Sequence, residues 1–139
     1  MKKLIVYRSF FGKTKRYAKL LRDEIESDMD KYSNVDESSL RKYDMVILCT
    51  ATYAGWISIS GYLKKHWRVL EKREVILVVI GGLPVDAKWS IRSYNKIPEY
   101  IRQGIKYFKL PAQVDSRDEN EARKECLSPV IKYIKSVAS

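Results

Sequence analysis

Residues that build metal and hydrolytic sites are scarce in this sequence. Its 139 residues include one histidine, His66, and two cysteines, Cys49 and Cys126. Their spacing matches no metal or redox motif, and it gives no basis for a Ser/His/Asp set around His66, which argues against metalloenzyme and hydrolase functions. Both cysteines fall in apolar patterns, so we expect two free, buried thiols.

Long hydrophobic runs are also absent. No stretch approaches the roughly 18 to 20 apolar residues of a membrane span. Only four apolar residues follow Met1 and two lysines, fewer than a signal peptide needs. We therefore expect a cytoplasmic protein. With 45% hydrophobic residues, the chain is predicted to fold as a single domain over residues 1–139.

Acidic residues are lacking from the first part of the chain. Residues 1–22 carry eight basic and no acidic side chains. Residues 23–44 carry three basic and eight acidic side chains, and residues 45–114 carry eleven basic and four acidic ones. The net charge of +10 indicates either a solvated basic face or contact with an anionic ligand, an acidic protein or a peripheral membrane surface. No RNP-type motif or aromatic–basic strand platform is present, so we expect no nucleic-acid partner.

The hydrophobic pattern alternates between two periods. Apolar runs predict strands at residues 4–7, 45–49, 75–80 and 105–110, and helical spacing predicts helices at residues 12–27, 59–70, 89–103 and 122–137. We expect Pro98 to interrupt the third helix and Pro129 to kink or split the fourth. Between residues 28 and 44 we expect a weak edge strand at 33–36 and little or no helix. This alternation is typical of an α/β fold with a parallel sheet covered by helices on both faces.

A candidate phosphate-binding loop joins the first strand to the first helix. It reads Ser9-Phe10-Phe11-Gly12-Lys13-Thr14. Gly12 permits a tight turn, the helix N-terminus offers unpaired N–H groups, and the hydroxyls and Lys13 add polar contacts. The glycine spacing fits neither G-x-x-x-x-G-K-[ST] nor G-x-G-x-x-G. The alternative is an ordinary strand-to-helix turn with Thr14 near the cap.

Three loops together resemble those of the flavodoxin family. The first is similar to that family's [ST]-x-x-G-x-[ST] phosphate loop. In the second, Tyr43-Asp44 leads through an apolar strand to Thr52-Tyr53-Ala54-Gly55-Trp56, with Ala51 where the family usually has proline. Gly81-Gly82 follows the next strand, at the position of the third family loop. The resemblance covers nearly the whole chain.

The resemblance implies FMN as the cofactor and a flavodoxin-like doubly wound sandwich, with a five-stranded parallel sheet of order 2-1-3-4-5. It implies no catalytic side chain and no metal, since the chemistry takes place at flavin N5. Tyr53 stands at the family's stacking position. Trp89 either closes the far side of the flavin ring or caps the sheet core, and we favour the cap. The implied cofactor-binding residues are Ser9, Phe10, Phe11, Gly12, Lys13, Thr14, Thr52, Tyr53, Ala54, Gly55, Trp56, Gly81 and Gly82.

Three functions are consistent with these features. The first is an FMN-dependent oxidoreductase that passes electrons from a small substrate to a quinone or similar acceptor. The opening sequence and basic character of this chain resemble those of flavodoxin-domain proteins related to the quinone-dependent protoporphyrinogen oxidase. The chain lacks the insertion near the last strand that long-chain family members carry. The second is an electron carrier that docks to larger redox enzymes, and the third is a cofactor-free interaction module. Basic residues near the flavin should make it less reducing than the flavin of acidic flavodoxins.

Overall fold

The computed structural model describes residues 1–53, 55–114 and 118–138. The strands within these residues are β1 (Lys3–Tyr7), β2 (Asp28–Lys31), β3 (Met45–Tyr53), β4 (Trp56–Ile57), β5 (Glu74–Gly81) and β6 (Ile105–Pro111). The helices are α1 (Lys13–Ile25), the 3₁₀ turn η1 (Tyr32–Asn34), α2 (Glu37–Leu40), α3 (Ser60–Leu70), α4 (Lys88–Asn95), α5 (Glu99–Arg102) and α6 (Glu119–Ala138). None of these helices is both long and apolar enough to span a bilayer.

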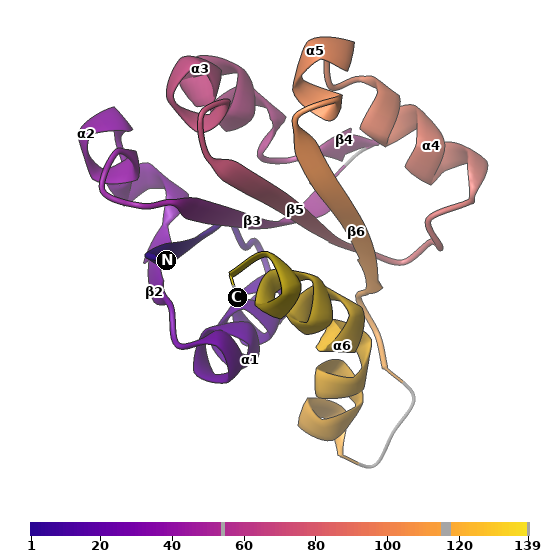
Figure 1. The fold of residues 1–139 in the computed structure, drawn as a ribbon. Coiled ribbons are helices and arrows are strands. Elements are labelled where there is room, and N and C mark those ends of the chain that lie inside the picture. The colour runs from indigo at the N-terminus through magenta and orange to yellow at the C-terminus, as the bar shows by residue number, and fades with distance from the viewer. Residues whose placement is uncertain (54, 115–117, 139) are drawn as a thin grey trace.

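Five of the strands form a parallel sheet in the order β2-β1-β3-β5-β6 (Figure 1). Helices α1 and α6 lie together on one face, and α2, α3, α4 and α5 lie on the other side. The predicted α/β class and the order 2-1-3-4-5 of the parallel strands are confirmed. Strand β4 is an addition, because it pairs antiparallel with the end of β3 and lies off the main path.

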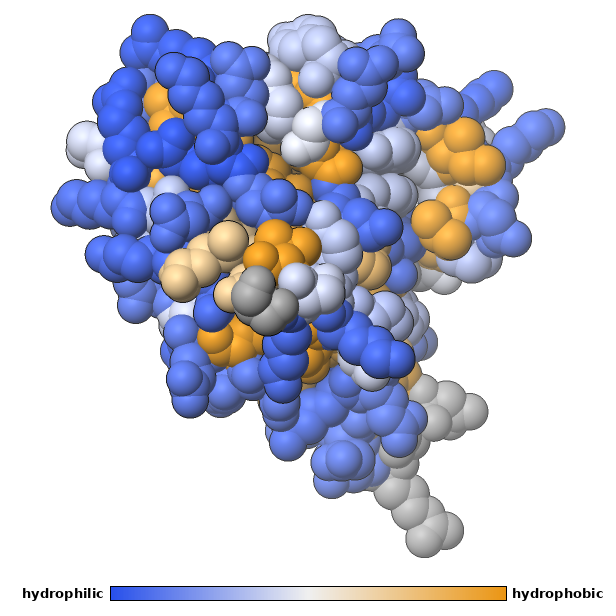
Figure 2. Space-filling model, viewed as in Figure 1, coloured by the Kyte–Doolittle hydropathy of each residue, from blue (hydrophilic) through white to orange (hydrophobic). Residues whose placement is uncertain are grey.

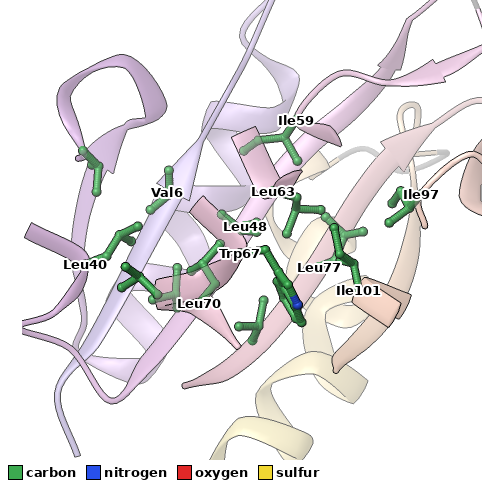
Figure 3. Close-up of a cluster of buried hydrophobic side chains, with 14 of the residues drawn as sticks. Val6, Leu40, Leu48, Ile59, Leu63, Trp67, Leu70, Leu77, Ile97 and Ile101 are labelled. Carbon is green, nitrogen blue, oxygen red and sulfur yellow. The ribbon is translucent and has the colours of Figure 1, made fainter. Parts of the chain in front are cut away.

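Two hydrophobic clusters fill the space between the sheet and its helices. Strand side chains alternate between the two faces, so neighbouring residues such as Ile47 and Leu48 belong to opposite clusters. On the α3 side, Leu48 and Leu77 of the sheet lie near Leu63 and Trp67 of α3 (Figure 3). Burial on both faces explains the nearly continuous apolar runs in β3 and β5.

The edge strand is not where the sequence pattern predicts it. We expected it at residues 33–36, whereas β2 occupies Asp28–Lys31 and pairs with β1 from Leu4 to Tyr7. At the outer edge of the sheet, β2 needs backbone pairing more than apolar side chains, so its sequence carries little strand signal. Val35 follows the 3₁₀ turn instead and is buried in the α3-side cluster.

Three further predictions concern where strands and helices end or break. Strand β3 continues through Tyr53, into the stretch predicted as a loop, because Thr52 and Tyr53 pair with β4. Helix α6 continues through Pro129, so the alternative in which this proline splits the helix is wrong. The predicted interruption at Pro98 is confirmed, since α4 ends at Asn95 and α5 begins after Pro98.

The two cysteines differ in their burial. Cys49 is fully buried in β3, which raises the pKa of its thiol to about 12. Cys126 on α6 is only partly buried, so the expectation of two buried thiols holds for Cys49 alone. Neither is in a disulfide, and no group of three His, Cys, Asp or Glu residues within the described ranges is arranged to hold a metal ion.

Candidate functional site

The loop from β1 to α1 forms one wall of the candidate site. Gly12 has a φ of 85° and precedes the first residue of α1. The Ser9 hydroxyl oxygen accepts hydrogen bonds from the backbone N–H groups of Gly12 at 3.1 Å and Lys15 at 3.4 Å. The first turn of α1 contains no acidic residue but does contain Lys13 and Lys15. Backbone dipole and side-chain charge therefore both favour an anion at this end of the helix.

Aromatic side chains extend this loop towards the next one. The ring of Phe10 stacks on the ring of Tyr53, with centroids 5.0 Å apart. The Arg8 guanidinium lies 5.2 Å from the centroid of the Phe10 ring and donates a hydrogen bond to the Ser58 carbonyl oxygen at 2.8 Å. Tyr53 is 56% exposed, so it offers a flat surface at the rim. Arg8 thus connects the first loop to the chain that follows β4.

The β3–β4 hairpin forms the second wall, and α4 holds it in place. Gly55 lies in the turn with a φ of 81°. Its carbonyl oxygen accepts hydrogen bonds from the Ser93 hydroxyl and the Lys96 ammonium, each at 2.9 Å. The same ammonium lies 4.0 Å from the centroid of the exposed Trp56 ring. Contacts from α4 and from the residue that follows it therefore fix the position of this turn.

The third wall is the end of β5. A Cβ atom built on Gly81 would lie 2.7 Å from the Thr52 hydroxyl oxygen and 2.9 Å from both Cε and Nζ of Lys109. A Cβ on Gly82 would meet nothing within 4 Å. Glycine at position 81 is thus what lets β3 and β6 side chains approach the strand end closely.

We expect Gly81→Ala to destabilise the protein by about 1–3 kcal/mol, the usual cost of overpacking. The Lys109 side chain can bend away, but the Thr52 hydroxyl is on a stiff, β-branched side chain. Urea unfolding midpoints measure the change. Gly82→Ala is the matched control and should stay within about 0.5 kcal/mol of the parent protein. Equal midpoints for the two variants would contradict this packing argument.

Two adjoining cavities open between these walls. One, of about 270 Å³, is lined by Phe10, Phe11, Lys13, Thr14, Ala51, Thr52, Tyr53, Ile80, Gly81, Gly82 and Ala112. The other, of about 320 Å³, is lined by Thr52, Gly55, Gly82, Leu83, Trp89, Ser90, Ser93 and Lys109. They share Thr52 and Gly82, so they are adjoining parts of a hollow over the carboxyl ends of the strands.

The structure places most of the predicted site residues around this hollow. Phe10, Phe11, Lys13, Thr14, Thr52, Tyr53, Gly55, Gly81 and Gly82 line one cavity or both. Ser9 and Gly12 shape the first loop without lining a cavity. Trp56 does not line either cavity, and its exposed ring packs against Lys96. Ala54 lies outside the described residues.

Sequence reasoning missed several residues of the second cavity. The interpretation of Trp89 as a cap on the sheet core is wrong, because this side chain is 62% exposed and lines the cavity. Although the basic residues between 88 and 109 were expected near the cofactor edge, Lys109, Ser90 and Ser93 were not among the predicted site residues. One available signal was position: Lys109 lies near the carboxyl end of a strand that pairs with β5, and such ends meet at one edge of a parallel sheet.

Comparison with known proteins gives consistent results. The family model described as "Flavodoxin domain" matches residues 4–120. No protein with a curated description matches the chain in sequence.

Solved structures share the fold at low sequence identity. Flavodoxin 2 from Bacillus cereus is 18% identical, with 98% of this chain and 99% of that chain covered and a TM-score of 0.65. The flavodoxin of Streptococcus pneumoniae TIGR4 is 19% identical, with 98% and 99% covered and a TM-score of 0.63. A flavoprotein from Lactobacillus acidophilus, solved in complex with FMN, is 17% identical, with 79% and 91% covered and a TM-score of 0.56.

Proposed function

We propose, from the premise that this chain belongs to the family of flavodoxin domains, that FMN is its cofactor and that it is a flavin-dependent redox protein. One observation carries the proposal. The anion-favouring start of α1 and the aromatic and glycine-rich ends of β3 and β5 border the same cavity. A phosphate group and a flat ring can therefore be held side by side.

The residues present fit the parts of FMN. We assign the phosphate to the loop of residues 9–14, where the backbone N–H groups at the start of α1, the Thr14 hydroxyl and the Lys13 ammonium can surround it. We assign the ring to the space beside Tyr53, with backbone groups of Gly55, Gly81 and Gly82 at its edge. Supporting this assignment, Tyr53, Gly81 and Gly82 line the cavity that also contains Lys13 and Thr14. Bound there, FMN would supply the electron-transfer chemistry.

For the reaction, we propose an oxidoreductase that passes electrons from a small substrate to a quinone or similar acceptor. The support is the second cavity, which adjoins the first and has an exposed Trp89 at its wall. A pocket beside the cofactor gives a small molecule a place to bind within reach of the flavin. We propose no catalytic acid or base among the protein side chains.

An electron carrier is the second candidate, and the surface around the site favours it. Hydrophobic patches are visible over α4 at the right-hand edge of an otherwise mostly hydrophilic face (Figure 2). In α4 and the loop before it, Leu83, Val85 and Ile91 are exposed, close in sequence to Lys88 and Arg92. Such a rim suits docking to an acidic redox protein or a peripheral membrane surface from the cytoplasmic side.

Titration of the purified protein with FMN tests the cofactor. We expect quenched flavin fluorescence with one FMN bound per chain at submicromolar affinity. Absence of binding at micromolar FMN would refute the redox function and favour a cofactor-free interaction module. For the loaded protein, turnover with NADH or NADPH as donor and menadione as acceptor would support the enzyme. Reduction by a redox protein alone, without turnover of small donors, would support the carrier.

A further inference from the structure

The second cavity contains a lysine that forms no ion pair with any acidic residue of the described part of the chain. Lys109 is half-buried near the carboxyl end of β6. Its ammonium donates a hydrogen bond to the Ser90 hydroxyl at 3.2 Å. No carboxylate of the described residues lies within 4.0 Å of it. Burial lowers the pKa of Lys109, because removing an ammonium from water disfavours its charged form.

The ammonium is directed towards the site by the alternation of β6. Lys109 contacts the end of β5 beside Gly81 and Thr52, on the side where α4 lies. Lys106, three residues earlier, is exposed on the other face, where its ammonium lies 5.3 Å from the centroid of the Tyr133 ring of α6. Two lysines of one strand thus have opposite surroundings, and only Lys109 lines the cavity.

The remaining lining suits a flat, partly apolar ligand. Trp89 and Leu83 provide apolar surface, and Ser90 and Thr52 carry hydroxyl groups. Ser93 is committed to the Gly55 and Trp89 carbonyl oxygens, at 2.9 and 2.8 Å. A partly desolvated cation beside an indole ring is the combination that attracts a conjugated ring with negative charge along its edge.

We propose that this cavity binds the anionic edge of a flat conjugated ring, with Lys109 as the cation that selects it. Two molecules have this chemistry. One is reduced FMN, whose ring extends from the neighbouring cavity and gathers negative charge at its pyrimidine end. The other is an aromatic carboxylate that binds beside FMN as a substrate. Binding of reduced FMN rests on the proposed function, whereas binding of an aromatic carboxylate can be tested without FMN.

Three variants test the role of Lys109. Lys109→Met removes the charge and keeps much of the side-chain length, and Lys109→Arg keeps the charge. Lys106→Met is the matched control, because it removes one positive charge from the same strand on the opposite face. Urea midpoints of all three identify any variant that has lost its fold, in which case Lys109→Gln replaces Lys109→Met.

The first measurement is the affinity of each variant for oxidised FMN and its two-electron potential, titrated with dithionite. If reduced FMN is the ligand, Lys109→Met weakens binding of reduced FMN relative to oxidised FMN about tenfold. This ratio corresponds to a potential about 30 mV more negative. Lys106→Met and Lys109→Arg should stay near the parent value.

The second measurement is binding of benzoate, followed by tryptophan fluorescence, with neutral benzamide as the comparison ligand. If an aromatic carboxylate is the ligand, the parent protein prefers benzoate, and Lys109→Met loses that preference about tenfold while its FMN potential is unchanged. The proposal is overturned if Lys109→Met changes neither quantity, or if Lys106→Met changes them equally. Failure of the parent protein to bind FMN refutes the proposed function alone. The benzoate measurement still tests whether the second cavity binds an anionic ring through Lys109.

Discussion

Gly12→Asp is expected to weaken FMN binding about 100-fold or more. The substitution places a carboxylate at the start of α1, where we assign the phosphate. Two like charges about 5 Å apart repel by about 3 kcal/mol at an effective dielectric constant of 20, and each 1.4 kcal/mol is a factor of ten in affinity. Any side chain is strained at the φ of Gly12, but aspartate and asparagine are among the residues that adopt a positive φ most readily, so both variants carry a similar backbone cost. FMN fluorescence titration measures the effect.

Gly12→Asn separates charge from shape in this experiment. Asparagine is nearly isosteric with aspartate and has the same tolerance for the φ of 85° found here. A Cβ at this position meets no atom within 4 Å, so neither variant is crowded. We expect Gly12→Asn to lose less than about tenfold in affinity. Near-normal affinity of Gly12→Asp would place the phosphate elsewhere and refute the loop assignment.

Tyr17→Ala is expected to destabilise the fold by about 3–5 kcal/mol, the cost of removing a large buried aromatic side chain. Tyr17 is completely buried one turn after the phosphate loop, in the cluster between the sheet, α1 and α6. Its hydroxyl donates a hydrogen bond to the Pro111 carbonyl oxygen at 2.7 Å. The side chain therefore joins the start of α1 to the end of β6. Urea unfolding measures the loss.

Tyr17→Phe isolates the hydrogen bond from the packing. It keeps the ring and removes only the hydroxyl, so we expect a loss of about 1 kcal/mol. The two variants should differ by at least about 2 kcal/mol. If they are equally destabilised, the hydroxyl rather than the ring makes the main contribution, and the packing argument for Tyr17 is wrong.

Elements that are buried on both sides could be predicted closely from the sequence. The apolar runs of β3 and β5 place their starts within one residue, because a strand between two helical layers has no polar face to blur the pattern. Strand β2 has Met29 as its single apolar residue and is held by pairing with β1, which no local pattern records. The β3–β4 hairpin was hidden for a similar reason, since its two-residue strand β4 is too short to show a period.

The candidate site likewise has one part that could be predicted from the sequence and one part that could not. The first loop could be predicted because Gly12 and two hydroxyl residues occur at a recognisable spacing in one continuous stretch. The second cavity could not, because it joins α4 to β6 through contacts such as that of Ser90 with Lys109. A lysine in a strand is usually read as a solvated side chain. Only the register of β6 against β5 shows which of its lysines reaches the cavity.

The position of α6 constrains the order in which the chain can complete its fold during synthesis. Helices α1 and α6 cover the same face of the sheet although more than 90 residues separate them (Figure 1). Until the ribosome has released residues 119–138, part of the apolar surface of β5 on this face stays uncovered. The α6 side chains that later cover it belong to the same cluster, which includes Ile76, Val78, Ile80, Leu127, Val130 and Ile134. A nascent chain therefore exposes a hydrophobic sheet face until α6 packs on it. Translational pausing before α6 would prolong this exposure and favour aggregation.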